Sequence, residues 1–75
     1  MKTDVGECNV STVRLPFDHG YGGTPLWYET MIFGGGDEVD QWQDRYATEQ
    51  EASEGHARVV ENLKAGRSPE DGRTP

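Results

Sequence analysis

Leu26-Trp27-Tyr28-Glu29-Thr30-Met31-Ile32-Phe33 is the stretch that decides the fold of this chain. It is rich in aromatic and β-branched residues, glycines lie on both sides of it and Pro25 directly precedes it, which predicts a β-strand. Successive side chains of a strand point to opposite faces, and both faces of this one are largely apolar. We therefore expect a central strand, or one whose second face is covered by a partner chain in a homodimer.

Two shorter strands are expected beside it. Residues 10–19 alternate apolar and polar side chains, and residues 42–48 form a short run that contains Tyr46. The clearest element follows, because Thr48 and Glu51 have the spacing of a helix-capping box and Gly66 suits the C-terminal end. The predicted helix directs one stripe inward, with Val60 beside it. The residues of this stripe are Ala52, His56, Val59 and Leu63.

These elements predict an α+β fold, with a small antiparallel sheet of two or three strands and one C-terminal amphipathic helix packed on one face. The domain is expected at residues 9–66, between flexible tails at residues 1–8 and 67–75, which hold few large apolar side chains. Gly55 is a poor helix former, and its position predicts a close approach between the helix and the sheet.

Charge and composition narrow the classes of partner. The 75 residues carry a formal net charge of −7, which opposes direct binding to nucleic acid and is compatible with a basic protein partner or with mimicry of nucleic-acid charge. No apolar stretch approaches the length of a membrane span, so no membrane association is expected. The single cysteine, Cys8, excludes an intrachain disulfide and fits a cytoplasmic location.

Four short segments together resemble a family of small proteins encoded by tailed bacteriophages and prophages. They are Asp18-His19, Glu29-Thr30-Met31-Ile32-Phe33-Gly34-Gly35, Arg45-Tyr46-Ala47-Thr48 and Gly55-His56. The resemblance spans roughly residues 10–63, and the family has no assigned activity. It implies a phage accessory protein in the cytoplasm of the host cell, and it implies no particular chemistry.

One group of side chains has the chemistry of a metal-binding or catalytic site. A hairpin that places Phe17 opposite Glu29 brings His19 diagonally close to Glu29, and His56 descends from the helix onto the same face. Two imidazoles and one carboxylate are the ligand set of many catalytic zinc sites. The same side chains also suit a hydrogen-bonded network that fixes strand register and helix orientation, or a site of proton transfer.

Two functions follow from these features. The first is a noncatalytic protein, without a cofactor, that binds a host or phage protein through an acidic, aromatic surface; its expected contact residues are Leu26, Tyr28, Ile32 and Trp42. The alternative is a protein that binds a divalent metal such as zinc, or a minimal hydrolytic enzyme, built on His19, Glu29 and His56. No nucleophile-elbow motif or cysteine pair is present, which favours the first.

Overall fold

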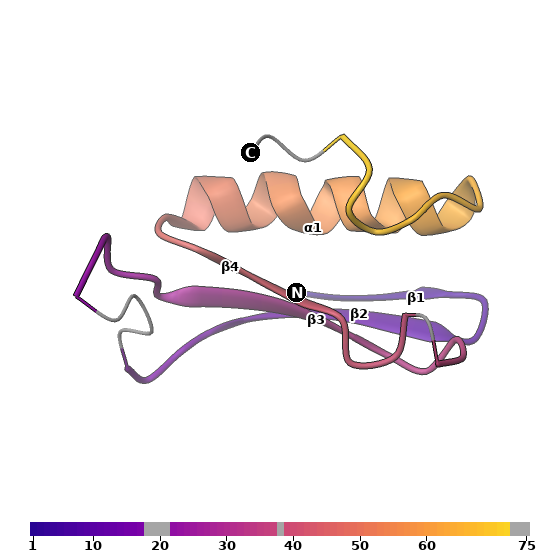
Figure 1. Cartoon of the computed structure of the whole chain (residues 1–75), viewed down its shortest axis with the longest axis horizontal. Coiled ribbons are helices and arrows are strands. Elements are labelled where there is room, and N and C mark those ends of the chain that lie inside the picture. Colours follow the sequence, from indigo (N-terminus) through magenta and orange to yellow (C-terminus); the bar gives the residue numbers. More distant parts are fainter. Residues whose placement is uncertain (18–21, 38, 73–75) are drawn as a thin grey trace.

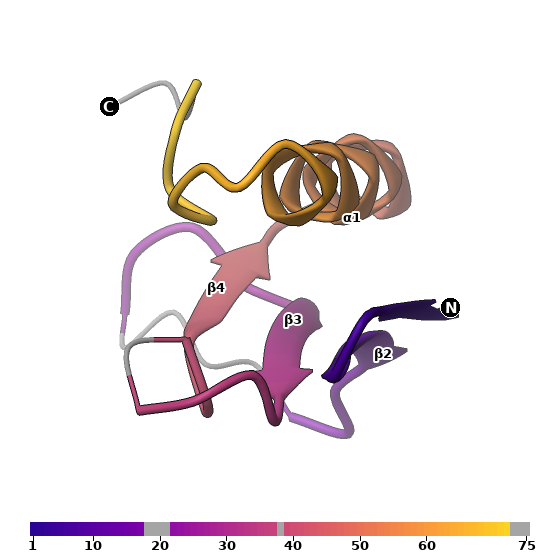
Figure 2. The same ribbon diagram turned by 90° about the vertical axis from the view of Figure 1, so that its right-hand side faces the viewer.

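The computed structural model describes residues 1–17, 22–37 and 39–72. Its elements are β1 (Lys2–Val5), β2 (Cys8–Arg14), β3 (Tyr28–Phe33), β4 (Gln43–Tyr46) and α1 (Glu49–Lys64). The four strands form one antiparallel sheet in the order β1-β2-β3-β4. Figures 1 and 2 show α1 lying across one face of this sheet. The predicted α+β class is confirmed, with four strands in place of two or three.

The strand that the sequence did not predict is β1, so the assignment of residues 1–8 to a flexible tail is wrong. A two-residue turn joins β1 to β2, and its first residue, Gly6, has a φ of 58°, as in a type II′ hairpin turn. Pairing extends one residue beyond β1. The Thr12 amide donates to the Met1 carbonyl at 2.8 Å, and the Met1 ammonium donates to the Thr12 carbonyl at 2.9 Å.

The register of β2 and β3 differs from the predicted one by four residues. Val13, rather than Phe17, lies opposite Glu29, and Ser11 lies opposite Met31. The predicted hairpin was wrong because β2 ends at Arg14, well before the glycine-rich segment that was taken as its loop. An even shift leaves Val13 and Glu29 on one face, since side chains alternate with a period of two.

The core lies between α1 and the face of the sheet that does not carry Val13 and Glu29. Val10, Ile32 and Val59 are fully buried and pack together. Thr12 and Thr30 face each other on the same side of the sheet and are also buried. The helix therefore covers the face that Glu29 does not share, in contrast to the prediction, which placed Glu29 beneath the helix.

The predicted helix is confirmed at both ends. The Thr48 hydroxyl accepts from the Glu51 amide at 3.1 Å and also lies 3.1 Å from the Glu51 carboxylate, so the two capping residues interact through their side chains. Gly66 has a φ of 72°, as expected of a residue just past the helix. Within the described residues, no helix is long and apolar enough to cross a membrane.

Gly55 lets α1 approach the sheet, as the sequence predicts. A Cβ at this position would overlap the ring of Tyr46, which ends β4 and is itself buried. The aromatic ring thus lies directly against the helix backbone. This contact fixes the distance between α1 and β4 by steric fit.

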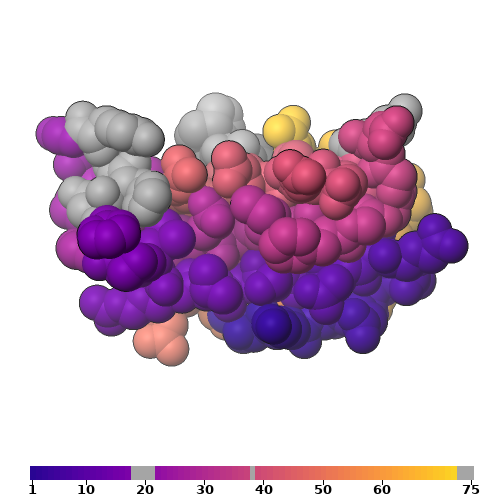
Figure 3. All heavy atoms as spheres, turned by 90° about the horizontal axis from the view of Figure 1, so that it is seen from below, coloured from indigo at the N-terminus to yellow at the C-terminus, as the bar shows by residue number. Residues whose placement is uncertain are grey.

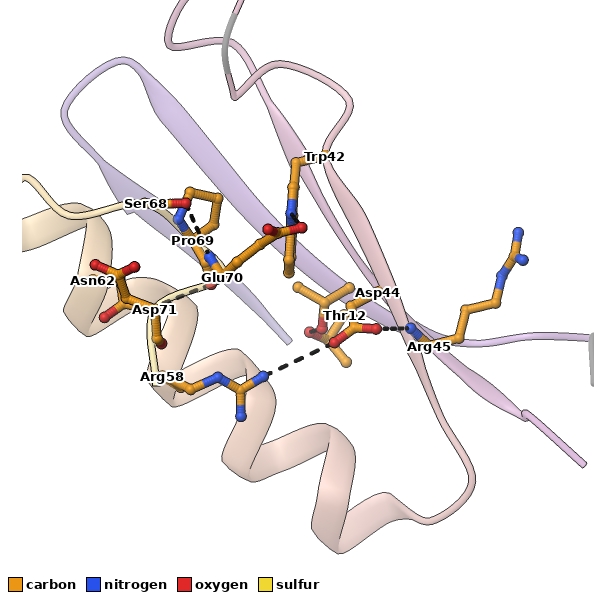
Figure 4. A network of polar contacts seen from close by, with 11 residues as sticks. Thr12, Trp42, Asp44, Arg45, Arg58, Asn62, Ser68, Pro69, Glu70 and Asp71 are labelled. Carbon is orange, nitrogen blue, oxygen red and sulfur yellow. Dashed lines mark hydrogen bonds and ion pairs between the residues drawn. The ribbon is translucent and has the colours of Figure 1, made fainter. Parts of the chain in front are cut away.

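Residues 67–72 return along α1 and were wrongly predicted as part of a flexible tail. Buried Asn62 holds them: its side-chain amide donates to the Asp71 carbonyl at 2.8 Å and to the Pro69 carbonyl at 3.3 Å. The Trp42 indole donates to the Glu70 carboxylate at 3.3 Å, which ties the segment to the sheet (Figure 4). Hydrogen bonds from one buried side-chain amide to two backbone carbonyls explain why a polar segment is anchored without a large apolar side chain.

Candidate functional site

His56 lies between the helix and the sheet and takes part in a chain of hydrogen bonds. Its Nδ1 lies 2.7 Å from the Thr12 hydroxyl, and its Nε2 lies 2.9 Å from the Thr3 hydroxyl. The Thr12 hydroxyl is also hydrogen-bonded to the Thr30 hydroxyl. We call these four residues, Thr3, His56, Thr12 and Thr30, the threonine–histidine chain; it links β1, α1, β2 and β3.

The surroundings of His56 keep its ring neutral. Burial lowers the pKa of His56, and the positive charge of the N-terminal ammonium lowers it further. A neutral imidazole carries one N–H donor and one acceptor, so one threonine hydroxyl accepts from the ring and the other donates to it. Both ring nitrogens are therefore engaged in holding the helix to the sheet, which is the structural role that the sequence offered as an alternative to metal binding.

Glu29 has a different partner on the other face of the sheet. Its Oε2 accepts from Arg45 Nε at 3.0 Å, and the register places the two residues opposite each other on β3 and β4. Their side chains are 14% and 29% exposed, so water still reaches the pair. A cation thus compensates the carboxylate within the sheet surface.

The ligand set His19, Glu29 and His56 is not brought together. Glu29 and His56 lie on opposite faces of the sheet, and His19 lies outside the described residues. Among residues 1–17, 22–37 and 39–72, no three His, Cys, Asp or Glu side chains are grouped so that they could hold a metal ion. The prediction of a shared face was wrong because the helix covers the opposite side of β3.

A second polar cluster surrounds the end of β4 and was not predicted. Arg58 of α1 approaches the Asp44 carboxylate at 3.9 Å (Figure 4). Burial raises the pKa of Tyr46, and the nearby Asp44 charge raises it further, against the opposing effect of Arg58. Asp44 and Thr30 are the polar neighbours of the Tyr46 hydroxyl, yet this hydroxyl and Arg58 Nε lack a well-formed hydrogen bond among the described residues.

The predicted protein-contact residues fall into two groups. Leu26, Tyr28 and Trp42 are half-buried, whereas Ile32 is fully buried beneath α1 and was wrongly assigned to a contact surface. The reason is again the choice of face, because Ile32 points toward the helix. Tyr28 also contacts Arg14, whose guanidinium lies 5.9 Å from the ring centre in a cation–π geometry.

The side of β3 that points away from α1 is the one that the helix leaves uncovered (Figure 3). We call the side of the sheet that points away from α1 the open sheet face; its residues are Lys2, Asp4, Asn9, Ser11, Val13, Glu29, Met31, Phe33, Gln43 and Arg45. Val13 is 46% exposed and Phe33 is 48% exposed. The expectation of an uncovered second face thus identified a real feature but named the wrong side chains.

Exposed acidic side chains also lie along α1, with Glu54 and Glu61 on its outer side and Glu49 and Glu51 on the two flanks of its first turn. The exposed glutamates of α1 are Glu49, Glu51, Glu54 and Glu61. We call these four residues the acidic helix face. The only basic residue of the last turn is Lys64, and none of the four carboxylates forms an ion pair with a described residue.

The described residues present two distinct exposed surfaces. His56 is enclosed by the core with both ring nitrogens occupied, and the acidic helix face and the open sheet face lie on opposite sides of the domain. No protein-family model, curated protein or solved structure matches this chain.

Proposed function

We propose that this protein is a noncatalytic binding protein that recognises a basic surface of another protein through its acidic helix face. The observation that carries the proposal is the presence on one helix of four exposed glutamates that form no ion pair with a described residue. Carboxylates without an internal cation remain available to lysine and arginine side chains of a partner. Complementary charge of this kind speeds association and selects the partner.

Rigid anchoring of α1 supports this role. The threonine–histidine chain holds the middle of the helix, and the packing of Tyr46 against Gly55 sets its height above the sheet. Glu54 and Glu61 are two turns apart on the outer side of α1, so their spacing is fixed before a partner arrives. Such preorganisation reduces the entropy lost on binding.

Trp42 is the aromatic residue that is tied to the segment beside α1. Trp42 is half-buried, and its indole N–H donates to Glu70, which belongs to the segment that folds back along α1 (Figure 4). Trp42 remains the predicted residue best placed for an aromatic contact. The resemblance to phage-encoded proteins further suggests that the partner is a host or phage protein and that the complex forms in the cytoplasm of the host cell.

Charge reversal with a matched control tests the proposal. The wild type and the double variant Glu54→Lys/Glu61→Lys are each used to capture proteins from host lysate at low salt, and a recovered partner is then purified and titrated. The control, Glu7→Lys/Asp37→Lys, makes the same change in total charge at exposed positions away from α1. We expect the control to retain the partner, the helix variant to lose it, and added salt to weaken the complex.

Equal capture by the wild type and the Glu54→Lys/Glu61→Lys variant would contradict recognition by α1. Circular dichroism of both double variants checks that the helix is intact. Competition between the protein and nucleic acid for a recovered partner would narrow the proposal to mimicry of nucleic-acid charge.

A further inference from the structure

The open sheet face has a layout that suits contact with a second copy of the chain. The register arranges its central residues in three rows across the strands, with Phe33 in the first, Ser11 and Met31 in the second, and Val13 beside Glu29 in the third. Exposed apolar groups therefore flank the middle row on both sides. Among the described residues, the helix and the segment that follows it pack on the other side of the sheet.

Charge distinguishes this face from the rest of the molecule. Its ionisable side chains are two basic and two acidic residues: Lys2, Arg45, Asp4 and Glu29. The face thus carries no net charge, although the whole chain carries −7. Two copies repel each other wherever acidic surfaces meet, and they avoid this repulsion when the open sheet faces meet.

The dimensions of the molecule set an upper limit on the area of this contact. The molecule measures 35 × 22 × 20 Å, and the open sheet face extends along the longest and shortest of these axes (Figures 1 and 3). The whole molecule projects on the order of 700 Å² onto this plane, and specific interfaces bury about 600–1,000 Å² per partner. A face-to-face dimer of the usual size therefore uses most of this side of the molecule.

We propose that the protein forms a homodimer through its open sheet faces, with the two-fold axis passing close to Ser11 and Met31. This axis places Phe33 against Val13 of the partner subunit and repeats that contact by symmetry. The two sheets pack as in a β-sandwich, with one helix on each outer side. Both acidic helix faces then remain exposed, so dimerisation is independent of the partner recognition proposed above and doubles the number of acidic surfaces.

Molecular mass in solution tests the dimer directly. Sedimentation equilibrium across tens to hundreds of micromolar should give twice the 8.3 kDa mass of the chain. Phe33→Glu places a charge in the proposed interface at a position that is already half-exposed, and it should yield a folded monomer. The matched control, Ser53→Glu, adds the same charge on the exposed surface of α1 and should remain dimeric.

Two results would overturn the proposal: a wild type that stays at 8.3 kDa at the highest concentration, or a dimer whose mass persists in folded Phe33→Glu. Chemical cross-linking tests the axis. In a Cys8→Ser background, Met31→Cys lies beside the axis and should cross-link to itself with a short bismaleimide, which spans the separation of about 10 Å between packed sheets, whereas Ser53→Cys should not. Cross-linking of Ser53→Cys in preference to Met31→Cys would refute the face-to-face arrangement.

Discussion

Replacement of Gly55 by alanine sets two well-characterised effects against each other. Alanine is the better helix former, and helix propensity taken separately predicts a gain of about 1 kcal/mol in the free energy of unfolding. The added Cβ, however, would overlap Cζ, Cε1 and the hydroxyl oxygen of Tyr46. Overpacking of a filled core costs about 1–3 kcal/mol.

The overlap should prevail because the ring cannot easily move. Tyr46 is 8% exposed and its backbone is paired with β3, so relief requires a shift of the strand or of the helix. We expect Gly55→Ala to destabilise the fold by up to about 2 kcal/mol, the overpacking cost less the gain in propensity. For a domain of this size, that loss lowers the melting temperature by up to roughly 16 °C.

Thermal and urea unfolding followed by far-UV circular dichroism measure the effect. Ser53→Ala, at an exposed position of the same helix, is the control and should stabilise the protein slightly. In a Tyr46→Leu background the three overlapping atoms are gone, so Gly55→Ala should there lose most of its cost and reveal a coupling of about 1 kcal/mol or more. An increase in the melting temperature of Gly55→Ala in the otherwise wild-type protein would refute the reasoning.

Three further predictions concern polar groups. Because burial lowers the pKa of His56, protonation of this group should not affect the free energy of unfolding above pH of about 6.5. Below that pH, the free energy of unfolding should fall as the pH decreases through the lowered folded-state pKa. Urea titrations at several pH values should show this fall in the wild type and its loss in His56→Gln. Asn62→Ala should cost about 1–3 kcal/mol, and hydrogen exchange should show residues 67–72 opening most. Glu29→Gln should change the free energy of unfolding by no more than about 1 kcal/mol, because the ion pair with Arg45 is partly exposed; a larger loss in urea unfolding would contradict this view.

The helix was predictable because its signals are local. The Thr48–Glu51 cap, the glycine at position 66 and the inward phase of His56 all concern residues within a few positions of one another. Even so, the inward stripe was incomplete: Asn62 is buried and Leu63 only half-buried. The burial of Asn62 depends on the chain returning along the helix, which no helical periodicity reveals.

The sheet was harder to predict because its pairing is not local. The first strand contains one large apolar residue, Val5, and was missed, although Gly6 at the first position of a two-residue turn was an available hairpin signal. The register of β2 and β3 was set four residues too far, since the connection between them begins directly after Arg14. Alternation with a period of two cannot distinguish registers that differ by an even number of residues.

The face of the sheet that α1 covers determines whether Glu29 and His56 can meet in one site. Both faces of the sheet carry apolar residues: Val10 and Ile32 lie beside the threonines on the inward face, and Val13, Met31 and Phe33 lie on the outward face. The helix covers the face with the threonines, and the hydrogen bonds of His56 stabilise this arrangement. A neutral, inward-facing imidazole needs both a donor and an acceptor, and paired threonine hydroxyls provide these without burying a charge.

A glutamate beneath the same helix would instead place a carboxylate in the core, at a cost of several kcal/mol unless a cation accompanies it. Glu29 avoids this cost on the outer face, where Arg45 and water compensate its charge. Phe33 and Val13 share that outer face and lie outside the core. Because the helix covers the other face, Glu29 is separated from His56, and Val13 and Phe33 form the exposed apolar surface on which the proposed dimer depends.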